Sequence, residues 1–518
     1  MAPPSSLSRN AKNAPAADRM LPVADRWSYL WLALGGILGV FSFGQWIVPL
    51  APWLSVLFFI RFMHTQTPLR GYVILSLVGM VSPAVHLVWL EVIPPSMFPT
   101  HMVYGMIIVP ALVNSLIYLA DRLMAPRLKG LAATLVFPVT FTAWEFLIMT
   151  NNPMGTFGAL AYTQYGNLPL MQVVSVTGLA GLTFLITWFG ASVNWIWERS
   201  FSWPAVRRCA ALYGTVMALV LLYGGARLVL HESPAGTMQI ASFTAMDLRG
   251  EGAELWSLAR NDRPAFRERA GEFHDRYFDE TRRQADAGAQ LVLWPEIAGI
   301  CGSEDEGALI ERGRQLAREK NIYLAMPLFI FQEPGPPANK LVVVDPGGEV
   351  VMEHYKYGGN QFEGTVRGDG VLHTFQTPSA TVSGVICWDM DFPGTVRQSG
   401  RNGTDILLAP AADWQTVSTI HASMSVFRAV ENGVSVVRQA VSGLSIVTDP
   451  YGRTLATMDH FTATERLMIA QVPVAGVRTV YSVIGDLFGW ATVIGFPFLV
   501  FWVVVLSRRA KQRNLRAD

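Results

Sequence analysis

The segment TVSGVICWDMDFP, residues 381–393, places a cysteine directly after a short run of small and branched apolar residues. Such a run is typical of a buried β-strand, so we expect Cys387 to lie where a strand ends. The carboxyl ends of strands are where α/β folds gather reactive side chains. Taken alone, a cysteine in this context is more often a small buried side chain, so Cys387 needs partners to count as a nucleophile.

Two ionisable residues upstream occupy the same kind of position. Glu296 ends the run LVLWPE (291–296), and Lys356 ends the run VVMEHYK (350–356). A lysine ammonium beside a thiol would lower the pKa of that thiol and favour the nucleophilic thiolate, and a carboxylate could accept the thiol proton. Each residue alone could be a solvated surface charge, but the three in this setting predict a catalytic site of Glu296, Lys356 and Cys387.

Apolar strands and amphipathic helices alternate around these residues, which predicts α/β layers with buried sheets. The expected domain, residues 235–476, is long enough for one substantial core. The three cysteines show neither CxxC spacing nor a nearby histidine cluster, so they give no zinc signature. We expect neither a metal nor another cofactor. The expected strands are Met238–Phe243, Leu291–Trp294, Ile322–Phe331, Lys340–Val344, Val350–Tyr355, Thr381–Ile386, Ile406–Ala409, Val434–Gln439 and Leu444–Thr448, and the expected helices are Ala253–Ala287, Gly307–Lys320 and Ala422–Glu431.

Both flanks of this domain are apolar. The whole chain is 51% hydrophobic and 15% charged, against about 25% charged in an average soluble domain. Crossing a bilayer takes roughly 20 apolar residues, and eight windows qualify, which predicts a polytopic α-helical membrane domain. The balance of 40 Lys and Arg against 39 Asp and Glu gives no reason to expect a nucleic-acid partner. The windows are Trp27–Gly44, Trp46–Phe62, Gly71–Val92, Met102–Ala120, Leu131–Met149, Leu170–Trp197, Cys209–Leu230 and Tyr481–Leu506.

Positive charge is distributed very unevenly over the connections between these windows. Cytoplasmic loops retain Lys and Arg, and seventeen of them lie in the two tails and in every second connection. The alternate connections, Ile93–His101 and Thr150–Pro169, contain none. We therefore expect both termini in the cytoplasm and the α/β domain outside it. The predicted organisation is a disordered cytoplasmic tail (1–26), spans one to seven (27–231), the α/β domain (235–476), span eight (477–507) and a basic cytoplasmic tail (508–518).

A few ionisable residues fall within the apolar windows, among them His86, Glu91, Glu145 and Asp486. Such groups are costly in a membrane and are often functional. Glu91 and Asp486 lie near window ends, where the interface is within reach. We expect packing roles for the set, with Glu145, the most interior, as the candidate for a functional role.

The three site segments resemble the nitrilase, or carbon–nitrogen hydrolase, superfamily, through WPE at Glu296, YK at Lys356 and GVICWDMDFP at Cys387. The resemblance continues through GTDILLAPAADW (403–414), FRAVENG (427–433) and VRQAVSGLSIVTDPYG (437–452). It implies an α-β-β-α sandwich and a Glu–Lys–Cys triad. A domain of this kind between a seventh and an eighth span resembles the apolipoprotein N-acyltransferase family, as do NPMGTFGALAYTQ (152–164) and LMQVVSVTGLAGLTF (170–184) in the membrane half.

This resemblance implies an acyltransferase of the bacterial inner membrane with its catalytic domain on the periplasmic side. Its expected reaction is phospholipid-dependent N-acylation of the N-terminal diacylglyceryl-cysteine of lipoproteins, through a cysteine thioester. The implied partners are a phospholipid donor, a lipoprotein acceptor and the bilayer. Two alternatives stay open: a membrane-anchored amidase or nitrilase acting on a small amide, and a transporter or receptor with a degenerate domain, against which the intact triad argues.

The chain departs from the family pattern around the triad. The family's lysine loop has Tyr-x-Lys followed by Pro-Phe-Gly-Glu, whereas this chain has His354-Tyr355-Lys356 and then YGGNQFEG, so Glu363 is the candidate for the auxiliary carboxylate. Asp389 stands where the family has Glu, and a backbone N–H near Trp388 would bind the oxyanion. We therefore expect Glu363, Trp388 and Asp389 to be auxiliary or substrate-binding residues. Four aromatic residues could line an acyl entry: Tyr357, Phe362, Phe392 and Trp414. Three charged residues are expected in internal ion pairs: Arg428, Glu431 and Arg438.

Overall fold

The computed structural model describes residues 22–94, 98–230 and 236–514, which form two compact units. One unit contains the described residues up to Leu147 together with Leu179–Val220 and the residues from Leu487 on. The other contains Ile148–Gly178 and the described part of Leu221–Asp486. Most of the expected tail 1–26 lies outside the described residues. The segment Ile148–Gly178, expected as a loop and the start of a span, thus belongs to the same unit as the α/β domain.

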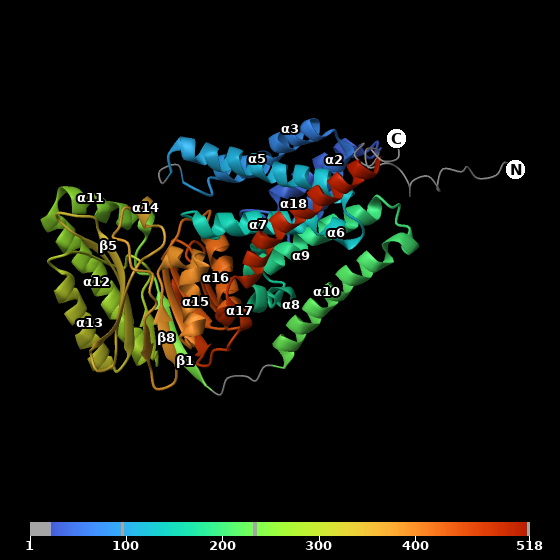
Figure 1. Cartoon of the computed structure of the whole chain (residues 1–518). Coiled ribbons are helices and arrows are strands. Elements are labelled where there is room, and N and C mark those ends of the chain that lie inside the picture. Colours follow the sequence, from blue (N-terminus) through green and yellow to red (C-terminus); the bar gives the residue numbers. More distant parts are fainter. Residues whose placement is uncertain (1–21, 95–97, 231–235, 515–518) are drawn as a thin grey trace. The chain divides into compact units, whose positions relative to one another are not determined.

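The described strands of the second unit form two sheets, one of seven strands and one of six (Figure 1). In the first sheet β1, β2 and β4 run parallel, and in the second β8, β9 and β10 do so. The first sheet has the order β13 (Leu467–Pro473), β1 (Thr237–Phe243), β2 (Leu291–Leu293), β4 (Tyr323–Phe331), β5 (Ala338–Val344) and β6 (Val350–Tyr355), with β3 (Gly299–Gly302) paired to β4. The second has the order β12 (Thr454–Asp459), β11 (Leu444–Thr448), β10 (Ser435–Val441), β9 (Ile406–Ala412), β8 (Thr381–Gly384) and β7 (Thr374–Gln376).

The two sheets pack face to face, and helices cover both outer faces. Leu408 and Val437 of one sheet join Leu293 and Leu341 of the other in a buried cluster, while Leu407, one residue along β9, joins the cluster under the helices. Side chains alternate between the faces of a strand, so a strand covered on both sides must be a continuous apolar run. The structure therefore has the expected α-β-β-α order. The helices are η7 (Leu248–Gly252), α11 (Ala253–Asn261), α12 (Arg263–Asp286) and α13 (Glu306–Lys320) beside the first sheet, and α15 (Pro393–Arg401) and α16 (Ser418–Asn432) beside the second.

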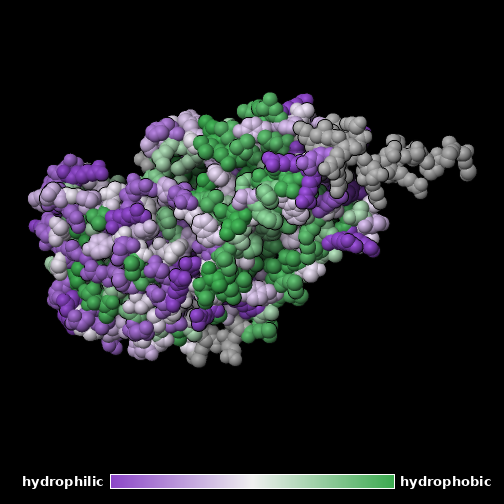
Figure 2. Space-filling model, in the orientation of Figure 1, coloured by the Kyte–Doolittle hydropathy of each residue, from purple (hydrophilic) through white to green (hydrophobic). Residues whose placement is uncertain are grey.

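Within the described residues, six helices are long and apolar enough to cross a membrane. Hydrophobic side chains gather over these helices, and hydrophilic ones over α11–α13 (Figure 2). The first two windows instead form α1 (Ser28–Val40) and α2 (Ala51–Thr65), of 13 and 15 residues, which reach only about 20 Å at 1.5 Å per residue. The count of eight spans therefore stays a prediction. The six helices are Pro68–Trp89 (α3, α4 and η4), Thr100–Arg127 (α5 and η5), Leu131–Asn151 (α6 and α7), Val174–Trp197 (α9), Trp203–Val229 (α10) and Leu487–Ala510 (within α18, Leu487–Asn514).

Two expected helical windows are interrupted by glycine. Gly178, with φ of 63° and ψ of −169°, breaks the window Leu170–Trp197, and Gly485, with φ of 63°, separates α17 (Val480–Ile484) from α18. Glycine adopts positive φ without the strain that a Cβ causes. At Gly178 a Cβ would also lie 2.6 Å from the ring of Tyr481. Apolar composition alone did not reveal these breaks, so both windows were predicted to start too early.

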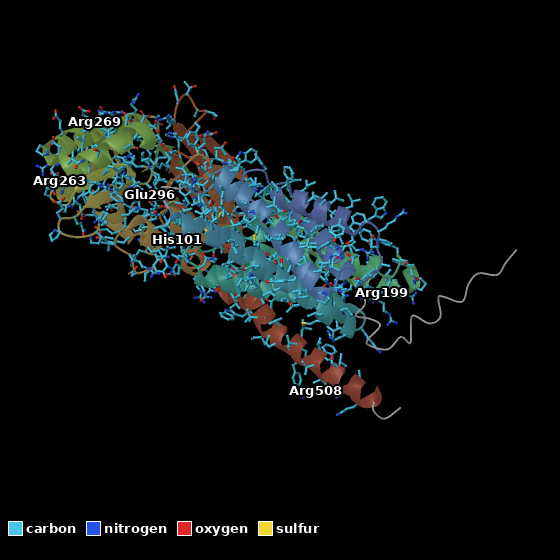
Figure 3. All side chains as sticks on the ribbon, turned by 90° about the horizontal axis from the view of Figure 1, so that it is seen from above. His101, Arg199, Arg263, Arg269, Glu296 and Arg508 are labelled. Atoms are coloured by element: carbon cyan, nitrogen blue, oxygen red, sulfur yellow. The ribbon has the colours of Figure 1, made fainter. Side chains whose placement is uncertain are left out.

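Two of the ionisable residues expected at membrane depth, Glu145 and His86, have hydrogen-bond partners within the membrane unit. Thr183 donates a hydrogen bond to Glu145 over 2.5 Å, and the His86 ring bonds to the Val40 carbonyl over 2.8 Å. Arg199, from a connection expected in the cytoplasm, and Arg508, from the C-terminal tail expected there, lie toward one end of the helices of this unit (Figure 3). His101, from a connection without Lys or Arg, lies toward the other end.

Candidate active site

The three expected catalytic residues follow the ends of three strands of the sandwich unit. Glu296 comes after β2, Lys356 directly after β6, and Cys387 after β8, at the start of the short helix η8 (Cys387–Asp391). Cys387 has a φ of 45°, a conformation that costs a non-glycine residue about 1–3 kcal/mol and tends to occur at functional sites. The structure brings these residues together from positions as far as 91 residues apart, 296 to 387.

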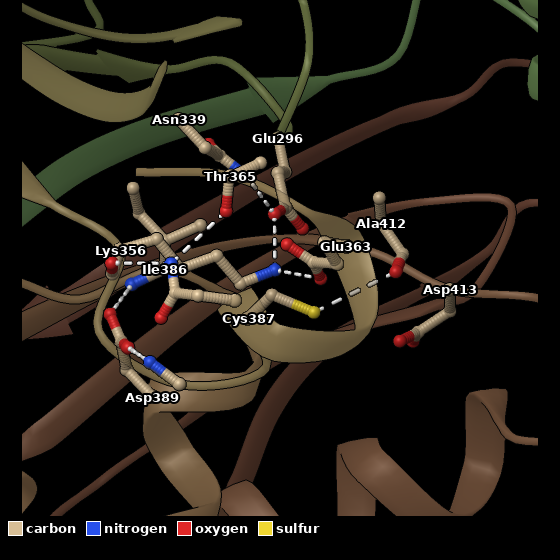
Figure 4. Close-up of polar contacts among 12 residues, drawn as sticks. Glu296, Asn339, Lys356, Glu363, Thr365, Ile386, Cys387, Asp389, Ala412 and Asp413 are labelled. Atoms are coloured by element: carbon tan, nitrogen blue, oxygen red, sulfur yellow. Dashed lines mark hydrogen bonds and ion pairs between the residues drawn. The ribbon is translucent and has the colours of Figure 1, made fainter. Parts of the chain in front are cut away.

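The ammonium group of Lys356 is the centre of the arrangement (Figure 4). Its Nζ donates to Oε1 of Glu296 over 2.7 Å and to Oε1 of Glu363 over 2.5 Å. Asn339 Nδ2 donates to the same Glu296 oxygen over 2.7 Å. The second oxygen of Glu296, Oε2, is buried and accepts no hydrogen bond from any described residue. It is therefore the oxygen that can take up a proton.

Burial would lower the pKa of the Lys356 ammonium, but the Glu296 and Glu363 carboxylates outweigh burial and raise that pKa well above its usual value. Lys356 thus remains a cation. Burial also raises the pKa of Glu363, and the opposing effect of Lys356 does not cancel this rise. Glu363, on the short helix α14 (Asn360–Glu363), reaches the lysine although its loop differs from the family pattern.

The electrostatics of Cys387 differ from the sequence-based expectation. Burial raises the pKa of the Cys387 thiol well above its usual value, the Glu296 carboxylate raises it further, and Lys356 offsets only part of the rise. The prediction that Lys356 lowers this pKa overall is therefore wrong, because the thiol is enclosed and a carboxylate lies beside it. The resting thiol is protonated, and its Sγ donates to the Ala412 carbonyl over 3.6 Å. Nucleophilic attack from this state needs a base.

Asp389 connects two segments around the site: the turn around Cys387, here called the cysteine turn, and the residues that follow Lys356, here called the lysine loop. Its Oδ1 accepts from the backbone N–H groups of Tyr357 (2.9 Å) and Gly358 (2.7 Å), and its Oδ2 accepts from Ile386 N (2.8 Å) and His354 Nε2 (2.8 Å). Burial would raise the pKa of Asp389, but these donors, His354 first among them, lower it. The carboxylate is fully buried, so it orders backbone around the site.

Trp388 also packs inside the site. Its ring lies 5.5 Å from the ring of Phe362, centroid to centroid, at an interplanar angle of 31°. The Tyr357 and Phe392 rings meet edge to face at 6.0 Å. Of the four aromatic residues expected at an acyl entry, all are half-buried: Tyr357, Phe362, Phe392 and Trp414.

Arg438, expected in an internal ion pair, belongs to a second charged cluster next to the cysteine, whose other members, Asp413 and His421, the sequence did not identify as its partners. Arg438 donates to both oxygens of Asp413 (2.9 and 2.8 Å), and His421 Nδ1 lies 3.0 Å from Asp413 Oδ1. Burial would raise the pKa of Asp413, but Arg438 and His421 lower it. Arg428 and Glu431 form the expected internal ion pair. Asp413 follows the carbonyl that accepts the hydrogen bond of the Cys387 thiol, and its signals in the sequence were its place after β9 and the superfamily-like stretch 403–414.

The segment 152–164, which precedes an apolar window, packs against the cysteine turn within the same unit. Thr156 donates through its backbone N–H and its hydroxyl to the Asp391 carbonyl, each over 2.9 Å. A Cβ on Gly155 would lie 2.3 Å from that carbonyl oxygen. Tyr162 lies on the short helix η6 (Leu160–Gln164), which precedes α8 (Leu168–Met171). Its hydroxyl accepts a hydrogen bond from Arg428 over 2.6 Å. These contacts explain why Ile148–Gly178 belongs to the sandwich unit.

Comparison with known proteins gives the family. Residues 35–192 match the apolipoprotein N-acyltransferase N-terminal domain, and residues 259–481 match the carbon-nitrogen hydrolase domain. The chain is 26% identical to the apolipoprotein N-acyltransferase of Geobacter metallireducens, over 91% of this chain and 94% of that protein. It is 26% identical to that of Bradyrhizobium diazoefficiens, over 70% of this chain and 71% of that protein. A crystal structure of an amidase from Nesterenkonia sp. is 22% identical and covers 47% of this chain and 94% of its own, with a TM-score of 0.37. The two domain models follow one another in this order and together match more than half of the chain, and the Geobacter metallireducens relative matches nearly all of it, so the chain belongs to the apolipoprotein N-acyltransferase family.

Proposed function

We propose that this protein N-acylates the N-terminal diacylglyceryl-cysteine of lipoproteins with an acyl chain taken from a phospholipid. The observation that carries the proposal is the Lys356 ammonium held between the carboxylates of Glu296 and Glu363, at the turn that bears the Cys387 thiol. The relatives named apolipoprotein N-acyltransferase support the acceptor class. The proposed catalytic residues are Glu296, Lys356 and Cys387.

In the first step the Cys387 sulfur attacks the ester carbonyl of the phospholipid, and Glu296 takes the thiol proton. Glu296 Oε2 suits this role because no described residue donates a hydrogen bond to it. Lys356 and a backbone N–H near Trp388 stabilise the oxyanion. The carbon–oxygen bond then breaks, Glu296 returns the proton to the departing lysophospholipid, and the acyl group remains on sulfur as a thioester.

In the second step the α-amine of the lipoprotein attacks the thioester carbonyl. Glu296 accepts a proton from the attacking nitrogen, the carbon–sulfur bond breaks, and the proton passes to the departing thiolate. The product is an amide, and Cys387 is again a thiol. Keeping water from the thioester favours the amine as acceptor, and the half-buried aromatic rings at Tyr357, Phe362, Phe392 and Trp414 suit an acyl chain.

Both proposed substrates are lipids, which accounts for an apolar helical unit and a sandwich unit in one chain. We propose a multi-pass protein of the bacterial inner membrane, with the sandwich unit on the periplasmic side. The support is the strict alternation of Lys and Arg between connections, together with the places of Arg199, Arg508 and His101 at opposite ends of the helices.

Reporter fusions test this sidedness. We expect a reporter that is active only in the periplasm to be active when fused at Gly335 and silent when fused at Asp518. A fusion at Gly130, beside Lys129 in a connection expected in the cytoplasm, is the matched control and should also be silent. Activity of a cytoplasm-specific reporter at Gly335 would invert the arrangement.

Mass spectrometry tests the proposed reaction directly. Incubation of the purified protein with phospholipid should add one acyl mass to Cys387, and a lipopeptide with a free diacylglyceryl-cysteine amine should then remove it. A protein that releases fatty acid, or ammonia from small amides, and never acylates the lipopeptide would instead be a membrane-anchored carbon–nitrogen hydrolase.

A variant of Glu363 tests whether this residue favours acyl transfer over hydrolysis. Its 2.5 Å contact with the Lys356 ammonium predicts that Glu363→Ala loosens the acyl-enzyme site, still allows acylation of Cys387, and slows transfer to the amine by about 10²–10⁴. Thioester formation, lipopeptide acylation and fatty-acid release are measured separately. The control is Glu349→Ala, which removes a carboxylate bonded to Arg314 outside the site and should change none of the three. Wild-type transfer by Glu363→Ala would make Glu363 a simple loop residue.

A further inference from the structure

One buried side chain beside the site has no part in the steps above. His354 lies two residues before Lys356 on β6 (Val350–Tyr355), and side chains two apart on a strand face the same side. Both are buried, with 2% and 1% of their surface exposed. His354 Nε2 lies 2.8 Å from Oδ2 of Asp389, so its N–H donates to a carboxylate that carries the charge.

Asp389 is the link between the two halves of the triad. It holds the backbone N–H groups directly after Lys356, at Tyr357 and Gly358, and the N–H of Ile386 directly before Cys387. The position of this carboxylate therefore sets the distance between the ammonium and the thiol. His354 is the only described side chain that bonds to Asp389, since the other three donors are backbone groups.

We propose that His354 is a positioning residue for acyl transfer: by holding Asp389 it keeps the lysine loop and the cysteine turn in register. A fully buried carboxylate is expensive unless donors surround it. Loss of the imidazole leaves one lone pair of Asp389 without a donor and leaves a space into which the carboxylate can shift. Such a shift moves the backbone on both sides of the site, and small misplacements of reacting groups are costly in rate.

The pair also joins two departures of this chain from its family pattern. This chain has His354 and Asp389, where the resemblance to the family implies Tyr and Glu. The structure places these two residues in direct contact. They therefore form a matched pair: each single reversal should mismatch the contact, and the double reversal should restore it.

The proposal rests on the proposed function for its kinetic consequence, so the experiment has two readouts. One is the alkylation rate of Cys387 by iodoacetamide, in full-length protein with Cys209 and Cys301 changed to Ala, which needs no substrate. The other is kcat and KM for acyl transfer from phospholipid to a lipopeptide. For His354→Leu we expect alkylation to slow by about tenfold and kcat to fall by about 10- to 100-fold with KM for phospholipid unchanged. His354→Gln, whose amide can still donate to Asp389, should recover most of both rates.

His274→Leu is the matched control, because it also removes a buried imidazole, one bonded to the Ile300 carbonyl of β3 over 3.1 Å and not to Asp389. It should lower the melting temperature without slowing alkylation. His354→Tyr and Asp389→Glu should each be slow, and the double variant should be faster than either. If His354→Leu does not fold, His354→Tyr, Asp389→Glu and the double variant test the proposal in its place.

The proposal is overturned if His354→Leu alkylates at the wild-type rate, if it slows no more than His274→Leu, or if the double variant is no faster than the single ones. A wild-type protein that never acylates a lipopeptide would refute the proposed function, while the alkylation rates would still decide the role of His354.

Discussion

Cys387→Ala is expected to abolish acyl transfer and to leave no acyl mass on the protein. The thiol is the atom that forms and breaks the thioester, and no other group at the site can replace it. Cys387→Ser should also be inactive, because a hydroxyl is far harder to deprotonate than a thiol. Full turnover by Cys387→Ala would remove the thioester mechanism and the triad with it.

The other two cysteines are the controls. Cys209 is buried on α10, and Cys301 is buried on β3, where burial raises its pKa to about 12. Cys209→Ala and Cys301→Ala should therefore retain most of the activity. Cys301 is the stricter control, since it lies five residues after Glu296 in the sequence. Parallel circular-dichroism spectra check that each variant is folded.

Glu296→Gln is expected to lower the rate of acyl transfer by about 10²–10⁴, the range for a lost general base. The amide oxygen can still accept from Lys356 and Asn339, so the geometry is retained, but the amide cannot carry the proton. The control is Glu353→Gln, the same change on β6, in a carboxylate that pairs with Lys340 and is half exposed. It should leave the rate unchanged.

Glu296→Gln should change the reactivity of the thiol in the opposite direction. The Glu296 carboxylate raises the pKa of Cys387, so its removal lowers that pKa and increases the thiolate fraction at neutral pH. Alkylation of Cys387 by iodoacetamide should therefore become faster while acyl transfer becomes slower. An unchanged rate of acyl transfer would contradict the role of Glu296 as the base, and slower alkylation would contradict its effect on the pKa of Cys387.

The positions of Glu296, Lys356 and Cys387 at strand ends could be predicted because apolar runs and the residues that end them are local features. A strand covered on both faces is expected to be apolar along its length, as β9 is. The same locality explains why α11 and α12 were predicted as one helix: Asp262, which caps α12 through Ala265 N, gives only a weak signal inside an amphipathic pattern.

Hydropathy predicted the long apolar helices but not where they begin. Gly178 and Gly485 interrupt two windows through backbone conformations that composition does not report. At Gly178 the deciding fact is the ring of Tyr481, more than 300 positions away in the chain. The same holds for the segment around Thr156, whose hydrogen bonds to Asp391 place it in the sandwich unit.

The chemistry at the cysteine was decided by tertiary structure. A lysine near a thiol predicts a lowered thiol pKa, but the pKa of Cys387 is raised because burial and the Glu296 carboxylate act more strongly than Lys356. Likewise His354 and Asp389 each depart from the family pattern, and only the fold brings their side chains to 2.8 Å. The sequence by itself determined which residues end the strands, since that depends on neighbours along the chain. Which protons those residues hold depends on burial and on charges from distant segments, and the tertiary structure alone sets both.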